Sequence, residues 1–294
     1  MLFHDMRGFP PNRVTLAHNF DLSKMNTSPF RIASGETVRL ADRPTDVSQG
    51  HDEEALEHPL ADNIDAIGDL QERLYAESEQ ALLVVFQAMD AGGKDSTTSH
   101  VFGPVNPQGV RVWSFKKPTE LELAHDFLWR VHKRVPGHGY IGVFNRSHYE
   151  DVLVVKVHGW APPEVIEARY DHIANFERLL GAGGTRVVKI MLHISKAYQR
   201  ERLVRRLERP DKHWKFNPAD LKERALWDDY MRAFETALER TSTPEAPWYV
   251  VPAENRDFRN ALVSQIVRET LESMDPQYPA PTFDPADYPP EAIE

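Results

Sequence analysis

The chain contains no cysteine, and that absence excludes disulfide bonds and thiolate metal sites. No apolar run approaches the roughly 20 residues that a membrane-spanning helix requires, so we expect no membrane partner. The segment Met1–Arg13 lacks the apolar block of a secretory signal peptide. These three absences favour a cytoplasmic protein.

Positive charge is also scarce, since the chain has 35 lysines and arginines against 45 acidic residues and a formal net charge of −10. Any site for a polyanion must therefore be local. The segment Lys196–Lys215 reverses the balance, because it holds eight lysines and arginines and only three acidic residues. The acidic total and the lack of a motif that combines aromatic and basic residues argue against a nucleic-acid partner.

Strands and helices are predicted to alternate along most of the chain. Hydrophobic residues make up 41% of it, which is enough for a substantial core. Short apolar runs predict strands at 81–86, 110–115, 140–145, 186–194 and 248–252. The segments between and around them predict helices at 60–79, 120–135, 162–180, 196–209, 220–240 and 256–274. This alternation predicts an α/β fold with a parallel sheet covered on both faces, and ligands beyond the carboxyl ends of its strands.

The chain divides into three regions by composition. Residues 1–50 have no sustained periodicity and predict an N-terminal arm that is either extended along the domain or partly disordered. Residues 51–274 contain no convincing linker and are expected to form one domain. Residues 275–294 hold six prolines and predict a tail.

The turn after the first predicted strand has the features of a phosphate-binding loop. Small residues allow backbone N–H groups to converge on an anion, and a helix N-terminus follows. Lys94 closes the loop and would reach terminal phosphates. The usual pattern G-x-x-x-x-G-K-[ST] is incomplete, because Ala88 and Asp95 replace a glycine and a hydroxyl residue. The alternative is a glycine-rich connection with an exposed lysine. The expected phosphate contacts in this loop are Ala91, Gly92, Gly93, Asp95 and Ser96.

Asp90 is unusual inside such a loop, because bound phosphates would repel its carboxylate unless a cation lay between them. Asp90 is therefore a candidate ligand of Mg²⁺. A turn residue that accepts hydrogen bonds from nearby backbone N–H groups is the alternative.

Two basic clusters accompany the loop. Arg202, Arg206 and Arg209 recur at helical spacing, with Arg205, Lys212 and Lys215 beside them, as in an arginine-bearing lid over a phosphoryl-transfer site. An ordinary solvated helix face would give the same pattern. The second cluster consists of Lys116, Lys117, Arg130, Lys133 and Arg134. This is more positive charge than one nucleotide needs, so it indicates a longer phosphate chain as substrate.

The segment Asn145–Asp151 follows the third predicted strand and begins at the functional edge of the sheet. Arg146 is a candidate phosphate contact there. Glu150 and Asp151 are either metal ligands or a solvated helix start, and His148 is a weaker candidate acid or base.

Four motifs together resemble the polyphosphate kinase 2 family, and the resemblance runs from about Ile64 to Tyr278. They are QAMDAGGK at 87–94, DFLWR at 126–130, NRSHYEDVLVV at 145–155 and KHWKF at 212–216. The resemblance implies a three-layer α/β/α sandwich of the P-loop kinase type, similar to thymidylate kinase, with a helical lid at about 195–217. It also implies Mg²⁺, with Mn²⁺ as the alternative ion, and dimers or tetramers of identical subunits.

The resemblance also assigns roles to residues. Asp90 and Lys94 match the essential first-motif positions, and Asn145 and Arg146 match the second motif, so these four are the expected catalytic residues. Arg202, Arg206 and Lys215 fall in the lid segment. Similar members often carry an acidic residue just before the second-motif strand, where this chain has Tyr140, so the choice between AMP and ADP stays open.

The predicted activity is reversible, Mg²⁺-dependent transfer of a terminal phosphoryl group from inorganic polyphosphate to ADP, AMP or both. The expected nucleotides carry adenine, with guanine as the alternative base. An ATP-dependent P-loop kinase of a small metabolite or nucleoside is the second hypothesis. A nucleotide-binding switch is the third.

Overall fold

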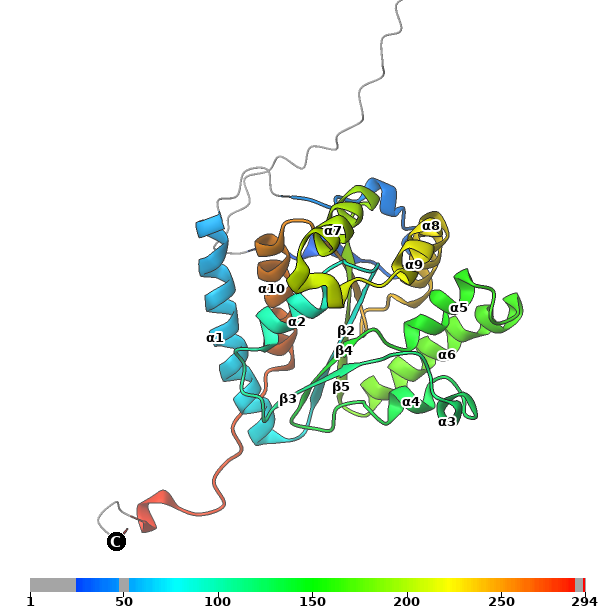
Figure 1. Ribbon diagram of the computed structural model, residues 1–294. Coiled ribbons are helices and arrows are strands. Elements are labelled where there is room, and N and C mark those ends of the chain that lie inside the picture. Colours follow the sequence, from blue (N-terminus) through cyan, green and yellow to red (C-terminus); the bar gives the residue numbers. More distant parts are fainter. Residues whose placement is uncertain (1–24, 48–52, 289–292, 294) are drawn as a thin grey trace, which may run out of the picture.

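The computed structural model describes residues 25–47, 53–288 and 293. Its centre is a six-stranded sheet with the strand order β1-β6-β5-β2-β4-β3. Helices cover both faces of this sheet (Figure 1). The strands are β1 (Arg31–Ile32), β2 (Ala81–Ala88), β3 (Val110–Ser114), β4 (Ile141–Asn145), β5 (Thr185–His193) and β6 (Trp248–Pro252).

The central strands are apolar because both of their faces are covered. Every residue of β4 and β6 is buried, as are all residues of β2 except Ala88 and all of β5 except Arg186. The pairings β2–β4, β2–β5, β3–β4 and β5–β6 are all parallel. The predicted α/β fold with a parallel sheet is confirmed, and the pairs of strands on either side of β2 create a switch point at its carboxyl end.

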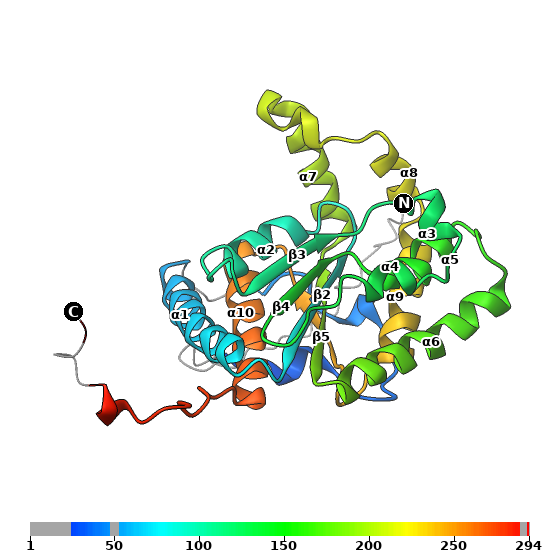
Figure 2. The same ribbon diagram turned by 90° about the horizontal axis from the view of Figure 1, so that it is seen from below.

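The helices form two outer layers. One layer contains α1 (Glu53–Glu77), α2 (Lys94–Phe102) and α10 (Arg256–Met274), which pack on one another. The other contains α4 (Trp129–His132), α5 (Val154–Val157), α6 (Pro163–Ala182) and α9 (Trp227–Thr241), with α3 (Glu120–Leu123) nearby (Figure 2). Local capping sets the start of α10, since the side chain of Asn255 accepts hydrogen bonds from the N–H groups of Asp257 and Phe258.

The single helix predicted at 120–135 is wrong, because the structure has the separate short helices α3 and α4 there. Asp126 explains the break. Its carboxylate accepts hydrogen bonds from the backbone N–H groups of Leu128 and Trp129, so it starts a new helical turn.

The helix predicted at 220–240 is also two helices, α8 (Ala219–Ala225) and α9, which meet at Leu226. Arg224 near the end of α8 donates hydrogen bonds to the carbonyl oxygen of Lys196 and to Gln199. The side chain of Trp227, at the start of α9, is buried in the core. The end of α8 and the start of α9 are therefore held by different parts of the molecule. The periodicity of apolar residues in the sequence does not indicate this break.

The sheet is not wholly parallel, because β1 pairs with β6 in the antiparallel direction. β1 belongs to the part of the predicted arm that the structure describes, residues 25–47. The backbone N–H groups of Val38 and Leu40 donate to Glu239 and Glu235 on α9, and His193 contacts the carbonyl oxygen of Leu40. The rest of the predicted arm, and the end of the predicted tail, lie outside the described residues.

One helix stands apart from both layers. Helix α7 (Lys196–Glu208) follows β5 and projects beyond the sheet edge (Figure 2). The 3-10 segment η5 (Pro210–Lys215) turns the chain back toward α8. In the described part of the chain, no helix combines the length and the apolar character that crossing a membrane demands.

Candidate active site

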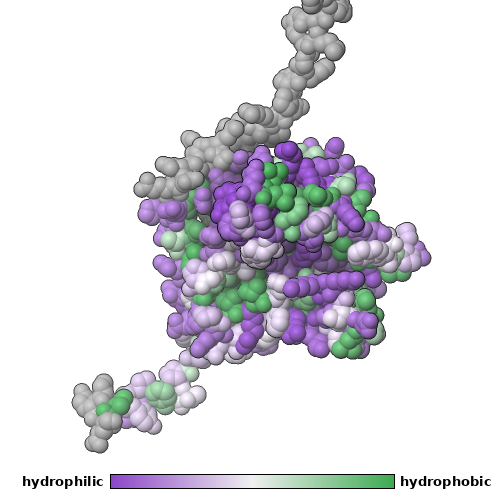
Figure 3. All heavy atoms as spheres, in the orientation of Figure 1, coloured by the Kyte–Doolittle hydropathy of each residue, from purple (hydrophilic) through white to green (hydrophobic). Residues whose placement is uncertain are grey.

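A cavity of about 820 Å³ lies at the carboxyl ends of β2, β3 and β4, beneath α7. Eleven of its lining residues are lysine or arginine and two are aspartate, so it concentrates positive charge in an acidic protein. The surface around α7 is mostly hydrophilic and is hollowed beside that helix (Figure 3). The lining comprises Asp90–Ser96, Ser114–Lys117, Asn145, Arg146, Arg202, Arg205, Arg206, Arg209, Lys212, Trp214, Lys215 and Arg256.

The loop between β2 and α2 forms the floor of this cavity. Ala91 and Gly93 have φ values of +65° and +99°, and the N–H of Gly92 bonds to the carbonyl oxygen of Met89. A methyl group on Gly92 would lie 2.8 Å from Cβ of Ala88 and 2.9 Å from the oxygen of Met89. Tight packing under the loop therefore requires glycine at position 92, while the left-handed backbone favours it at 93. The backbone is folded as an anion-binding turn that opens into a helix.

Lys94 is the first residue of α2 and is largely buried in the loop. Its Nζ donates to the carbonyl oxygen of Ala88 at 2.9 Å. Burial lowers the pKa of Lys94, and the positive charge of Arg146 lowers it further. A bound phosphate group would reverse that effect, because an anion stabilises the ammonium form.

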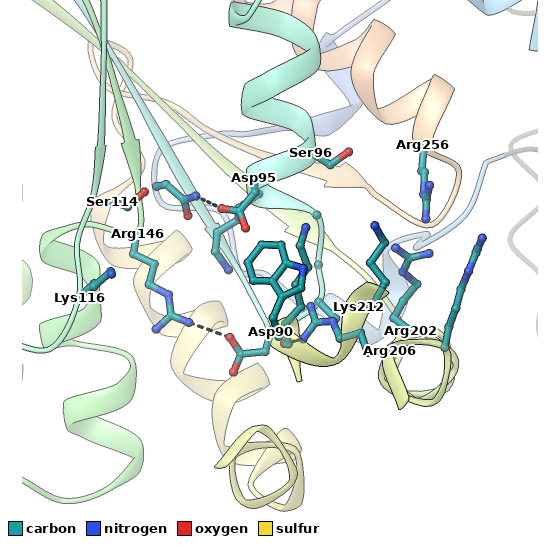
Figure 4. A pocket seen from close by; sticks show the side chains of 18 of the residues that line it. Asp90, Asp95, Ser96, Ser114, Lys116, Arg146, Arg202, Arg206, Lys212 and Arg256 are labelled. Carbon is teal, nitrogen blue, oxygen red and sulfur yellow. Dashed lines mark hydrogen bonds and ion pairs between the residues drawn. The ribbon is translucent and has the colours of Figure 1, made fainter. Parts of the chain in front are cut away.

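Asp90 and Arg146 form an ion pair in the lining of the cavity (Figure 4). Their Oδ1 and Nη2 atoms are 2.8 Å apart. Arg146 has a φ of +62°, an uncommon backbone conformation for a residue with a side chain, and its N–H bonds to the carbonyl oxygen of Phe86 on β2. The turn after β4 is thus fixed to the strand that carries the phosphate loop.

Asn145 and Asp95 make a second bridge between the same two segments. The amide Nδ2 of Asn145 donates to Oδ1 of Asp95 at 2.5 Å. Asp95 occupies the position where the usual loop pattern has a hydroxyl residue, so here a carboxylate faces the end of β4. All four expected catalytic residues lie together at one sheet edge.

The acidic groups of the site suit a cation that also binds phosphate. Among the described residues, no group of three His, Cys, Asp or Glu side chains could hold a metal alone. Mg²⁺ commonly takes only one or two carboxylates and completes its shell with water and substrate phosphates. Asp90 and Asp95, the second of which directly follows Lys94, fit that pattern. Glu150 lies behind Arg146, where burial raises its pKa.

Helix α7 presents its basic face to the cavity from the opposite side (Figure 4). Gln199 is fully buried at its base and donates to the backbone oxygen of Asp90 at 2.9 Å. Burial lowers the pKa of Arg202, with Arg256 and Arg205 adding to the effect. Arg206 bonds to Asp220 at 3.2 Å. The expected contacts Arg202, Arg206 and Lys215 all line the cavity, together with Arg205, Arg209 and Lys212.

The second basic cluster divides. Lys116 and Lys117 line the cavity, while Arg130 and Arg134 do not. Arg130 stacks over Phe115 and bonds to the carbonyl oxygen of Lys116, and Arg134 stacks over Trp113. These two arginines support β3 and the segment that directly follows it from outside the cavity, a direction that their spacing in the sequence did not indicate.

Tyr140 and His148 also lie away from the cavity. Tyr140 precedes β4 at the amino edge of the sheet, where it contacts Tyr75 and Arg111. His148 is buried against Glu177 at 3.2 Å. Neither side chain lines the cavity, so neither is placed to touch an acceptor there.

Three lining residues were not singled out from the sequence, namely Ser114, Phe115 and Arg256, and Trp214 entered only as part of the motif KHWKF. Ser114 and Phe115 end a predicted strand, which is where polar contacts were expected. Arg256 begins α10, far along the chain, and the sequence offered no local sign of its role. Figure 4 shows it across the cavity from Lys116, on the side of Ser96 and the arginines of α7.

Comparison with known proteins gives a consistent result. A sequence family described as polyphosphate kinase 2 matches residues 50–279. The AMP/ADP-polyphosphate phosphotransferase of Meiothermus ruber is 53% identical over 84% of this chain and 92% of its own. The ADP-polyphosphate phosphotransferase of Rhodopseudomonas palustris is 44% identical over 88% of this chain and 94% of its own.

A solved structure agrees with the sequence matches. The crystal structure of polyphosphate kinase 2 from Arthrobacter aurescens superposes with a TM-score of 0.85 at 43% identity. The match covers 88% of this chain and 93% of that one.

Proposed function

The chain belongs to the polyphosphate kinase 2 family and is an enzyme that transfers phosphoryl groups, and on that premise we propose that it moves a terminal phosphoryl group between inorganic polyphosphate and the adenine nucleotides AMP and ADP. The site residues that line the cavity are proposed to carry out this transfer. The proposal keeps guanine as the alternative base of the acceptor.

The observation that carries the proposal is the length of the cationic lining. Positive side chains extend from Lys116 and Arg146, past Lys94, to Arg202 and Arg256 on the far wall. A nucleotide alone would leave much of this charge without a partner, whereas a phosphate chain lying through the cavity would neutralise it. A kinase that uses one nucleotide and one small metabolite has no need for this wall.

Mg²⁺ is proposed to bind between Asp90 and the substrate phosphates, where it would neutralise charge on the reacting groups. The ion pair between Asp90 and Arg146 would then loosen, because a divalent cation competes with the guanidinium for the same carboxylate. Asp95 is the second carboxylate within reach of the phosphates.

The roles of the remaining groups follow from their positions. Lys94 and the loop N–H groups hold the phosphate at the point of transfer. Arg146 and Lys116 orient the second substrate from the β3–β4 side. Arg202 and Arg206 on α7 are proposed to close over the charge that develops in the transferred group. Donor and product bonds are both phosphoanhydrides, so the reaction runs in both directions.

The localisation, the oligomeric state and the lid are proposed as the sequence predicted them. We propose a cytoplasmic homo-oligomer, a dimer or tetramer, with 195–217 as the lid, on the ground that the chain belongs to this family.

The test is an assay with Mg²⁺, long-chain polyphosphate and ADP, with no ATP added. We expect ATP to form, and ADP to form when AMP replaces ADP. Lys94→Ala should reduce both rates by about 10²- to 10³-fold, the usual effect of removing one donor that stabilises developing negative charge. Lys222→Ala is the matched control, since Lys222 is exposed and lies outside the cavity.

Three outcomes would contradict the proposal. Phosphorylation of a nucleoside or metabolite by ATP, with no use of polyphosphate, would favour the alternative kinase. Tight nucleotide binding without transfer would favour a switch. Normal activity of the Lys94→Ala variant would show that the site is elsewhere.

A further inference from the structure

Arg259 lies directly beneath the phosphate loop, although it does not line the cavity. It is on the first turn of α10 and its residue is only 2% exposed. A methyl group on Gly93 would be 2.3 Å from its Nη1 and 3.2 Å from its Cζ. Its Nη2 also donates to Oγ of Ser96, at 3.3 Å. The guanidinium therefore supports the turn at which the loop becomes α2.

The charge of Arg259 has no carboxylate partner among the described residues. Its hydrogen-bond acceptors are the hydroxyl of Ser96 and the amide oxygen of Asn260. The Asn260 oxygen lies 2.9 Å from Nη2 and 3.1 Å from Nε of Arg259. Both acceptors are neutral. Two other cations are buried among the described residues: Lys189 has Glu177 at 2.5 Å, and Lys94, at the anion-binding turn itself, donates to the carbonyl oxygen of Ala88. Buried charges are normally paired, so an arginine left with neutral acceptors requires an explanation.

The surroundings increase this imbalance. The pKa of Arg259 is lowered to about 10, chiefly by burial; the charges of Arg256 and Arg202 contribute to this lowering, while Tyr198 and Asp257 act in the opposite direction. The side chain is still a cation at neutral pH. Two further cations beside it make the free site unfavourable for its charge, and an anion in the loop would correct this.

We infer that Arg259 is a positioning residue whose counter-charge is the phosphate bound in the loop above it. The inference rests on the proposed function, since it takes phosphate as the anion. Arg259 fixes the backbone of Gly93 by contact and stabilises the anion by charge through the loop. Position 93 consequently needs glycine for two reasons, its φ value and the close approach of the guanidinium.

This role has a consequence that a purely structural role lacks. In the free protein the unpaired charge destabilises the fold, while in the phosphate complex it contributes to affinity. Removal of the charge with retention of volume should thus act in opposite directions on free stability and on binding.

The experiment compares full-length wild type with Arg259→Met and Arg259→Lys. The melting temperature is measured alone and with tripolyphosphate, without a nucleotide. For the Met variant we expect an unchanged or higher melting temperature alone, a ligand-induced shift reduced by at least half, and a KM for polyphosphate raised about tenfold, within the usual range of coupling between sites. The Lys variant keeps the charge and should recover most of the shift.

Arg268→Met is the matched control, because Arg268 is on the same helix but pairs with Glu272 near the surface. Its ligand-induced shift should equal that of wild type. A Met variant that melts lower alone and shifts as much as wild type would overturn the inference, since Arg259 would then be a packing residue. If the Met variant does not fold, the Lys variant decides, because loss of its shift would equally overturn the role of the charge.

Failure of this inference can be distinguished from failure of the proposed function. If wild type itself does not respond to tripolyphosphate, then the proposed function fails. If wild type responds and the Met variant responds equally, then only the role of Arg259 fails.

Discussion

At the scale of single residues, Glu177 is the centre of a buried polar cluster. Its carboxylate accepts from Nζ of Lys189 at 2.5 Å and from the hydroxyl of Tyr149 at 2.9 Å. Burial alone would raise the pKa of Glu177, but Lys189 and His148 outweigh it and lower that pKa. Because His148 and Tyr149 lie two and three residues after Arg146, the cluster also holds the turn that carries Arg146.

We expect Glu177→Gln to destabilise the protein by about 3–5 kcal/mol, because it leaves Lys189 as an unpaired buried cation. Urea denaturation measures this. The exposed Glu164, on the same helix, is the control, and Glu164→Gln should change stability by less than about 0.5 kcal/mol. The double variant Glu177→Leu with Lys189→Met should recover much of the loss, and a double variant as unstable as the single one would contradict the explanation.

The buried His193 should make the free energy of unfolding depend on pH. Burial lowers its pKa from 6.5 to about 4, so the unfolded chain binds a proton there more readily than the folded protein. The lowered pKa of His193 adds to the free energy of unfolding above pH 6.5. This stabilisation, at most about 3 kcal/mol, is lost as the pH falls toward 4. Asp151 acts in the opposite direction, because burial raises its pKa to about 6 and the folded protein holds that proton more tightly.

The measurement is the difference in unfolding free energy between wild type and His193→Gln from pH 7 to pH 4. Asp151 is common to both proteins, so its effect cancels. The variant should lose less stability on acidification than wild type. Parallel curves would show that His193 is not the group responsible.

At the scale of secondary-structure elements, the buried side chain of Gln199 ties helix α7 to the site. Gln199 joins it to the backbone oxygen of Asp90 in the phosphate loop and accepts from Arg224 on α8. Gln199→Ala should leave the sheet intact but lower kcat about tenfold, because the arginines of α7 lose their alignment. Steady-state kinetics checks this. Arg200→Ala, one exposed residue further along, should have little effect, and equal losses in both variants would argue against alignment.

The elements also show what sequence reasoning could reach. The strand run 81–86, the loop that follows it and the helix 256–274 were predictable, because buried apolar runs, glycines and amphipathic spacing are local signals. The breaks after Leu123 and at Leu226 were not, since they depend on the carboxylate of Asp126 and on a contact between α7 and α8. The same limit applies to Arg256 and Arg259. Nothing near them in the sequence shows that α10 begins beside the phosphate loop.

At the scale of the whole molecule, the charge of the cavity is opposite in sign to the net charge of the chain. The surface as a whole would repel a polyanion, while the cavity attracts it, so binding should be sensitive to salt. The KM for polyphosphate should rise steeply with NaCl concentration, and each cation removed should reduce the slope of the double-logarithmic plot by about one unit, by analogy with nucleic acids.

Arg256→Ala tests that point, since Arg256 is at the far wall of the cavity. We expect a smaller salt slope for this variant and the wild-type slope for Lys222→Ala. Identical slopes for all three proteins would mean that polyphosphate does not reach Arg256.

The bond from Arg224 to the carbonyl oxygen of Lys196 brings together the beginning and the end of the projecting segment 196–224. A stretch of chain that leaves and re-enters a body at one point can be exchanged without rethreading the rest. Chimeras that take this segment from a relative should therefore remain folded, and would make it an interchangeable module for redesigning which phosphate acceptors the enzyme admits.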